Sequence, residues 1–140
     1  MDLNKKLIAG MKREETFHIQ DEHAAIHVGS GSLKVLATPW MIAFMERVSH
    51  RMLAEHLSEG YSSVGAMVTV RHLAPTPIGS PIRVQAEITE VDFPKVKLFI
   101  TAWDGKEQVG TGDHLRVVIE EASFHQRIEA KRKYLQQLNL

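Results

Sequence analysis

The chain has 140 residues, a length that suits one domain, and its 17 basic and 17 acidic side chains give zero net charge. This balance supplies no positive field for DNA or RNA, so nucleic-acid binding is not expected. The absence of cysteine excludes disulfides, thiolate metal sites and cysteine nucleophiles, and it suits a cytoplasmic protein. The N-terminal "MDLNKKLIAGM" does not resemble a signal peptide, and no apolar run reaches the ~20 residues that cross a bilayer.

The first half of the chain predicts a short strand, a loop and a long helix. The segment "EETFHIQ" (14–20) predicts the strand, and "GSGS" (29–32) marks the loop. Thr38 and Pro39 indicate a helix start, because threonine is a common N-cap and proline is favoured at the first helical position. Apolar residues then recur at helical spacing through 40–57, and Gly60 ends the helix.

The second half predicts four strands between residues 62 and 120, followed by a charged helix, "SFHQRIEAKRKYLQQLNL". The turn-forming connections "APTPIGSP", "VDFP" and "DGKE" separate the strands. Four sets of alternating apolar residues define them: Val64, Ala66, Val68 and Val70; Ile82, Val84, Ala86 and Ile88; Val96, Leu98, Ile100 and Ala102; and Leu115, Val117 and Ile119. There is no internal repeat and no linker, so residues 1–140 are predicted to form one domain.

The predicted order is strand, long helix, four antiparallel strands and short helix. One long helix beside a mostly antiparallel sheet makes an α+β layer pair, with the sheet curling around the helix. That arrangement is the hotdog fold, which we expect here together with a short C-terminal helix.

Two polar side chains are predicted to point between helix and sheet. At 100° per residue, Glu46 falls within the apolar arc of the helix. His72 shares its strand parity with Val68 and Val70 and should face the helix. A buried lone carboxylate is costly, so we expect Glu46 to be partly buried and within reach of His72, directly or through one water. In the alternative interpretation, Glu46 reaches solvent at the edge of the arc and His72 merely ends a strand.

The run "GSGSLKVLATPWMIAFME…SVGAMVTVRHLAPTPIGSPIRVQAEI…GTGDHLRVVI" resembles the fluoroacetyl-CoA thioesterase-like family of hotdog proteins over roughly residues 29–124. The resemblance places that family's catalytic trio on Thr38, Glu46 and His72. It also places a glycine backbone N–H on Gly65 and an arginine of the last strand on Arg116. It implies a homodimer, or a tetramer built from one, with active sites at or near the subunit interface.

Thioester hydrolysis needs a nucleophile and donors that stabilise an oxyanion. Glu46 would attack directly or activate a water, and His72 would orient the carboxylate and carry protons; both routes for Glu46 stay open. Eight helical residues span about 12 Å, so Thr38 and Glu46 should not touch within one chain. Either the substrate spans them, or they act together across a dimer interface, or Thr38 is simply an N-cap.

The sequence departs from the fluoroacetyl-specific enzyme in the segment "AAIHVGSGSLKVLA", which lacks that enzyme's lid phenylalanine. A different acyl-CoA is therefore expected. Trp40 and Phe44 are candidates for shaping the acyl pocket, with helix core packing as the alternative.

Other histidines are weaker candidates. His23 and His27 lie four apart without an evident third ligand, so no metal site is predicted. His50 lies one turn beyond Glu46, where it is interpreted as a surface residue. His114 and Arg116 share one parity of the last strand, on either an exposed face or a CoA phosphate site.

The function predicted from the sequence is hydrolysis of a small acyl-CoA to the free acid and CoA, without a cofactor. The alternative is a hotdog protein that binds an acyl-CoA or another small ligand without turnover. A hydratase is disfavoured because no "GDxNPxH"-like segment is present.

Overall fold

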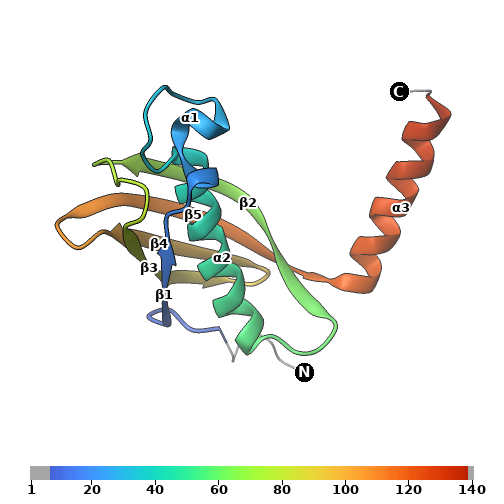
Figure 1. The fold of residues 1–140 in the computed structure, drawn as a ribbon. Helices are drawn as coiled ribbons and strands as arrows, with labels where there is room; N and C mark the ends of the chain where they lie inside the picture. The colour runs from blue at the N-terminus through green and yellow to red at the C-terminus, as the bar shows by residue number, and fades with distance from the viewer. Residues whose placement is uncertain (1–6, 139–140) are drawn as a thin grey trace.

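The computed structural model describes residues 7–138, which form one curved sheet, one long central helix and shorter helices at either end of the chain (Figure 1). The strands are β1 (Lys12–His18), β2 (Tyr61–His72), β3 (Pro81–Asp92), β4 (Lys95–Trp103) and β5 (Gln108–Glu120). The helices are the 3-10 turn η2 (Asp21–His23), α1 (Ala25–Val28), α2 (Thr38–His56) and α3 (Glu121–Gln137). The predicted terminal features that extend into residues 1–6 and 139–140 lie outside the described residues.

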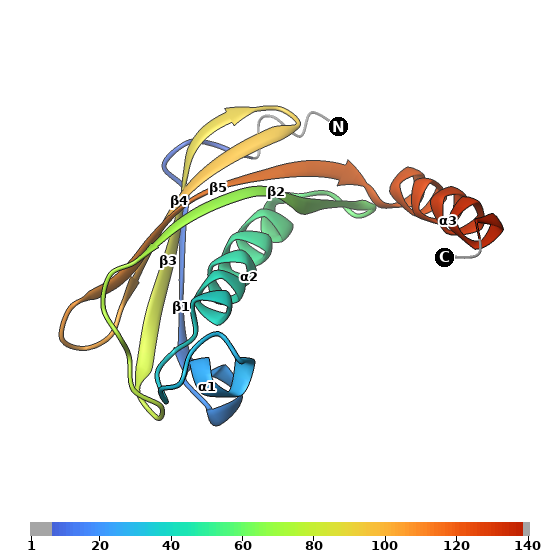
Figure 2. The same cartoon turned by 90° about the horizontal axis from the view of Figure 1, so that it is seen from above.

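The five strands form one antiparallel sheet in the order β1-β3-β4-β5-β2. The sheet curves around α2, which lies against its concave face (Figure 2). This arrangement confirms the predicted hotdog fold. Both β1 and β2 are edge strands, and the backbone groups on the outer side of an edge strand are open to pairing with another chain.

Helix α2 begins at Thr38, one residue before the first helical position predicted for Pro39, and its N-cap is Ala37. The N-cap interpretation of Thr38 is therefore wrong: no side chain caps this helix, and Thr38 occupies the first helical position. The apolar periodicity correctly predicted most of the buried face, which consists of Met41, Phe44, Met45, Val48, Ser49, Met52 and Leu53. Because Ala37 provides the cap position, the Thr38 hydroxyl is available for another partner.

The predicted core residues of β3 and β4 are buried as expected, but β5 buries the opposite face from the one its apolar residues indicated. His114, Arg116 and Val118 are buried, whereas Leu115 and Val117 are only half-buried. Gly110 and Gly112 share the buried face, and a Cβ at these positions would meet the sulfur atoms of Met41 and Met45 at 2.4 and 3.1 Å. The sheet approaches α2 closely there because these positions carry no side chain.

Strand β2 contains an irregularity that reverses its alternation. Gly65 pairs with Arg116 and Met67 pairs with Leu115, so Ala66 is the extra residue of a β-bulge. After the bulge, Val68, Val70 and His72 face α2 as predicted. Before it, Ser63 and Gly65 take the inward positions, so the prediction that Val64 and Ala66 face the helix is wrong.

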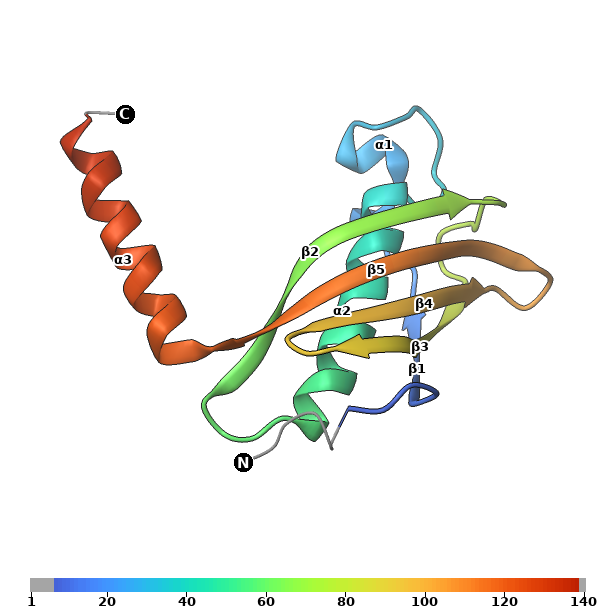
Figure 3. The ribbon, with the colours of Figure 1, turned by 180° about the vertical axis from the view of Figure 1, so that it is seen from behind.

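The segments near the two ends of the described chain differ from each other in structure. The loop predicted before α2 contains the short turns η2 and α1, and β1 begins two residues earlier than predicted. Helix α3 starts directly after β5 and extends away from the sheet, and none of its residues is buried (Figures 1 and 3). Within residues 7–138, no helix is both long and apolar enough to cross a membrane.

Candidate active site

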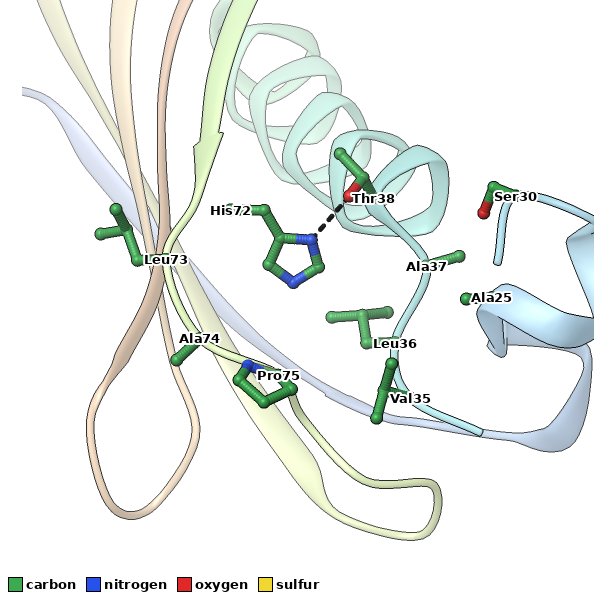
Figure 4. A pocket seen from close by; sticks show the side chains of 10 residues that line it. All are labelled: Ala25, Ser30, Val35, Leu36, Ala37, Thr38, His72, Leu73, Ala74 and Pro75. Carbon is green, nitrogen blue, oxygen red and sulfur yellow. Dashed lines mark hydrogen bonds between the residues drawn. The ribbon is translucent and has the colours of Figure 1, made fainter. Parts of the chain in front are cut away.

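The start of α2 and the end of β2 bring Thr38 and His72 together. The Thr38 hydroxyl and His72 Nδ1 lie 2.7 Å apart, a hydrogen-bonding distance (Figure 4). The residues are 34 positions apart in sequence, and the antiparallel wrap of the sheet around the helix brings them side by side. Burial lowers the pKa of His72 below its ordinary value, so the ring is neutral at pH 7.

The second ring nitrogen of His72 is left without a partner. Its Nε2 is buried and makes no hydrogen bond to any of residues 7–138. A buried polar atom without a partner is uncommon in native proteins and costs free energy. A group from outside this chain, such as a substrate or a second subunit, would satisfy it.

Thr38 and His72 line a hollow of about 390 Å³ whose other walls are mostly aliphatic (Figure 4). The remaining lining residues are Ala25, Ser30, Val35, Leu36, Ala37, Leu73, Ala74 and Pro75. The segment before α2 supplies five of these eight residues and the chain after β2 supplies three. The hollow is therefore a small, weakly polar space beside one neutral histidine.

Glu46 lies in a second hollow, two helical turns further along α2. This hollow, of about 230 Å³, is lined by Glu46, Gly65, Ala66, Met67, Val68 and His114. The Glu46 side chain is 45% exposed, which confirms that it is partly buried. A Cβ on Gly65 would lie 3.4 Å from Glu46 Oε2, so the absent side chain leaves the carboxylate room beside the strand.

A buried cation lies behind the Glu46 carboxylate. Arg116 Nη1 is 4.0 Å from Glu46 Oε2, and the arginine residue is 5% exposed. Arg116 donates from Nε to the Ser63 hydroxyl at 2.9 Å and from Nη2 to the Ser63 carbonyl at 3.0 Å. The interpretation of His114 and Arg116 as an exposed face is therefore wrong. Arg116 lies behind Glu46, and its burial and its bonds to Ser63 place the guanidinium away from the surface.

Glu46 and His72 both face the layer between helix and sheet, as predicted, but one chain does not bring them together. Among residues 7–138, no hydrogen bond or ion pair joins the two side chains. Thr38 holds His72 at the start of α2, and Glu46 follows about 12 Å along the helix axis. The expectation that Glu46 contacts His72 directly is thus not met inside a single chain.

Trp40 and Phe44 lie on another side of α2, in an aromatic cluster. Phe44 stacks on Phe17 of β1 with ring centroids 4.4 Å apart, and the His23 ring lies 4.5 Å from Trp40 and 5.0 Å from Phe44. The Arg47 guanidinium covers both Trp40 and Phe44 at 5.5 Å. Neither aromatic residue lines the hollow at Thr38 and His72, so the geometry favours core packing for this pair.

His23 also has a structural position, because its Nδ1 accepts a hydrogen bond from the Gln20 backbone N–H at 2.9 Å.

His114 is the polar residue whose burial the sequence interpretation did not predict. Its shared parity with Gly110 and Gly112 was the available signal, since small residues on one strand face indicate close approach of another element.

Comparisons with known proteins show the family to which this chain belongs. The family described as fluoroacetyl-CoA-specific thioesterase matches residues 19–122. The fluoroacetyl-CoA thioesterase of Streptantibioticus cattleyicolor is 34% identical over 98 residues, which cover 70% of each chain. A crystal structure of a mutant fluoroacetyl-CoA-specific thioesterase in complex with fluoroacetate and CoA has a TM-score of 0.79 and 28% identity, covering 84% of this chain and 99% of that one.

A hot-dog-like protein from Thermanaerovibrio acidaminovorans superposes with a TM-score of 0.87 over 94% of this chain and 97% of its own. At 24% identity, that likeness establishes the fold alone.

Proposed function

Since this chain belongs to the fluoroacetyl-CoA-specific thioesterase family, we propose that it is an acyl-CoA thioesterase that hydrolyses a small acyl-CoA to the free acid and CoA. The observation that carries this proposal is the pairing of Thr38 with a neutral, partly buried His72 in the lining of a small hollow. The fluoroacetyl-CoA-specific relative was crystallised with fluoroacetate and CoA, which supports an acyl-CoA as the substrate class.

The residues have distinct roles in the proposed reaction. Glu46 attacks the thioester carbonyl or activates a water to do so. Neutral His72, oriented by Thr38, accepts and returns a proton. Backbone N–H groups at the start of α2 and near Gly65 stabilise the oxyanion. The departing thiol ionises near pKa 8.5, so its release requires less proton donation than the release of an amine does.

The proposal includes a two-fold dimer that completes each active site. One chain separates Glu46 from the Thr38 and His72 pair by about 12 Å of helix, and His72 Nε2 has no partner among residues 7–138. A second copy joined along the open edge of β2 would bring Glu46 of one subunit toward the Thr38 and His72 pair of the other.

The acyl group is proposed to be small and aliphatic. The walls beside Thr38 and His72 come mainly from alanine, valine, leucine and proline, without an aromatic side chain among the residues that line this hollow. Such a surface binds an alkyl group by apolar contact and offers little that distinguishes a fluorine atom from a hydrogen. Selectivity for fluoroacetyl-CoA is therefore not part of the proposal.

A thiol-release assay with a panel of acyl-CoAs tests the activity. We expect turnover of at least one short-chain acyl-CoA, with rates that fall as the chain outgrows the hollow. Saturable binding of acyl-CoAs without thiol release would instead support the alternative of a non-catalytic binding protein.

Subunit complementation tests the composite site. Thr38→Ala and Glu46→Gln variants are mixed, unfolded together and refolded so that subunits exchange. In a composite site, each mixed dimer has one intact site, so the mixture should recover about a quarter of wild-type activity. If each site lies within one chain, every site carries a lesion and the activity stays at the level of the separate variants.

A further inference from the structure

A buried histidine and a buried arginine lie in contact behind Glu46, an arrangement that the proposed mechanism does not use. His114 and Arg116 are 3% and 5% exposed and alternate on the helix-facing side of β5. His114 Nδ1 lies 2.8 Å from the Met67 carbonyl oxygen, and its Nε2 lies 3.2 Å from Arg116 Nη1. Both ring nitrogens therefore have a partner.

These two contacts determine the protonation of the ring. A carbonyl oxygen only accepts, so the hydrogen must be on His114 Nδ1. A guanidinium only donates, so Nε2 must present a lone pair to Arg116 Nη1. The ring is thus the neutral Nδ1–H tautomer. A proton on Nε2 would set two N–H groups against each other and push Arg116 away.

The contacts continue from the β-bulge to the carboxylate of Glu46. The Met67 carbonyl, next to the extra residue Ala66, orients His114, and His114 holds Nη1 of Arg116. Ser63 holds the other side of the same guanidinium through Nε and Nη2. With three of its N–H groups fixed, Arg116 keeps Nη1 4.0 Å from Glu46 Oε2.

We propose that His114 is a positioning residue for Glu46: as an obligate acceptor it fixes the Arg116 guanidinium, which holds the Glu46 carboxylate in its working orientation. This inference rests on the role of Glu46 in the proposed function. It differs from that role because the hydrogen bonds of the His114 ring go to the Met67 carbonyl and to Arg116 and not to the Glu46 carboxylate, so that His114 acts through Arg116.

The charged groups around His114 are consistent with a neutral ring. The charged groups that act on His114 are Glu46 of α2 and Arg116 of its own strand. His50 of α2 lies near Arg116, and burial and Arg116 lower the pKa of its ring. Burial lowers the pKa of His114, and Arg116 lowers it further, while the Met67 carbonyl and Glu46 act in the opposite direction. Protonation near neutral pH is therefore disfavoured.

Two substitutions of His114 separate its donor from its acceptor. In His114→Asn, the side-chain amide can still donate to the Met67 carbonyl but does not reach Arg116. In His114→Gln, the longer side chain can place its carbonyl oxygen near the position of Nε2. We expect kcat to fall about tenfold in the asparagine variant, with KM little changed. In the glutamine variant, kcat should be restored most of the way to the wild-type value.

A double-mutant cycle with Glu46→Gln distinguishes a positioning role of His114 from a merely structural one. If His114 acts through Glu46, His114→Asn should change the residual rate of the Glu46→Gln enzyme less than twofold. An equal tenfold loss in both backgrounds, or a His114→Asn enzyme with wild-type kcat, would overturn the proposal.

A measurement on the wild-type protein does not depend on activity or on variant folding. ¹⁵N NMR of the imidazole nitrogens at pH 7 should show His114 as the neutral Nδ1–H tautomer. The Nε2–H tautomer or a charged ring would overturn the inference. If wild type hydrolyses no acyl-CoA, the proposed function fails, and this spectrum still decides whether the arrangement of His114 and Arg116 exists. If hydrolysis occurs and depends on Glu46 but not on His114, only the positioning role fails.

Discussion

The two hollows along α2 differ in their chemistry. The hollow at Thr38 and His72 has mostly aliphatic walls, one hydrogen bond and a histidine whose second nitrogen lacks a partner among residues 7–138. The hollow at Glu46 contains a half-exposed carboxylate held against a buried cation. The difference shows that this fold keeps a neutral histidine and a charged carboxylate apart within one chain.

This separation has a physical basis. A histidine that carries protons near neutral pH must be able to lose its charge easily, and a weakly polar hollow favours the neutral ring. A carboxylate with reduced access to water needs a nearby cation, and Arg116 of β5 lies 4.0 Å from Glu46. Each group therefore lies in the environment that its proposed role requires.

The largest expected effect comes from removing the negative charge of the Glu46 side chain. Glu46→Gln keeps the size of the side chain but abolishes its nucleophilic and basic oxygen. The rate of thiol release from the best acyl-CoA should fall by roughly 10²–10⁴-fold. The protein should remain folded, because a neutral amide costs less to bury than a carboxylate does. Steady-state kinetics and a thermal denaturation curve check both points, and activity within about threefold of wild type would remove Glu46 from the mechanism.

Removing the hydroxyl of Thr38 tests the role of the hollow at Thr38 and His72. Thr38→Val preserves the shape of the side chain and removes the hydrogen bond to His72, so kcat should fall about tenfold. Thr38→Ser keeps the hydroxyl and serves as the matched control, with activity expected close to wild type. Thermal stability should change little in Thr38→Ser and fall modestly in Thr38→Val, because Ala37 is the N-cap of α2 but valine leaves His72 Nδ1 without its partner. Equal rates for the valine and serine variants would contradict a role for this bond.

A smaller effect is expected from adding a methyl group to the Glu46 hollow. In Gly65→Ala, the new Cβ would lie 3.4 Å from both Glu46 Oε2 and His114 Cε1, in ordinary contact. The methyl should restrict the carboxylate without unfolding the strand and lower kcat/KM about threefold. Gly105→Ala is the control, since a Cβ there meets nothing within 4 Å. An identical change in both variants would mean that Gly65 has no specific place beside Glu46.

The smallest expected effect is the acid sensitivity of folding. Burial lowers the folded-state pKa values of His72 and His114, so below about pH 6.5 the unfolded chain binds more protons than the folded one. The free energy of unfolding that depends on these neutral rings is fully present above about pH 6.5, and it is lost as the pH falls through the folded-state pKa values of the two histidines. The melting temperature should drop by roughly 3 °C or more between pH 7.5 and 5.5.

Substitution of each histidine shows which hollow contributes more to that loss. His114→Gln should remove more of the drop than His72→Gln does, because His114 is more deeply buried and faces Arg116. The reverse order would contradict the ranking of the two environments.

The sequence predicted the fold and the directions of the main site residues, but not their partners. Helical periodicity placed Glu46 on the inner side of α2, and strand parity placed His72 toward the helix. The same parity argument was wrong for Val64 and Ala66, because a bulge shifts the alternation by one residue. It also chose the wrong face of β5, where half-buried Leu115 and Val117 carry the apolar signal.

The sequence by itself determined the order of the elements, the periodicities that place residues on one face, and the family resemblance that identifies Thr38, Glu46 and His72. Only the tertiary structure decided that His72 bonds Thr38, that Glu46 lies in a separate hollow, and that His114 and Arg116 are buried behind it. The reason is that periodicity is a local property of the backbone. Which side chains meet depends instead on strand register, on the bulge at Ala66 and on the close approach of α2 to the glycines of β5.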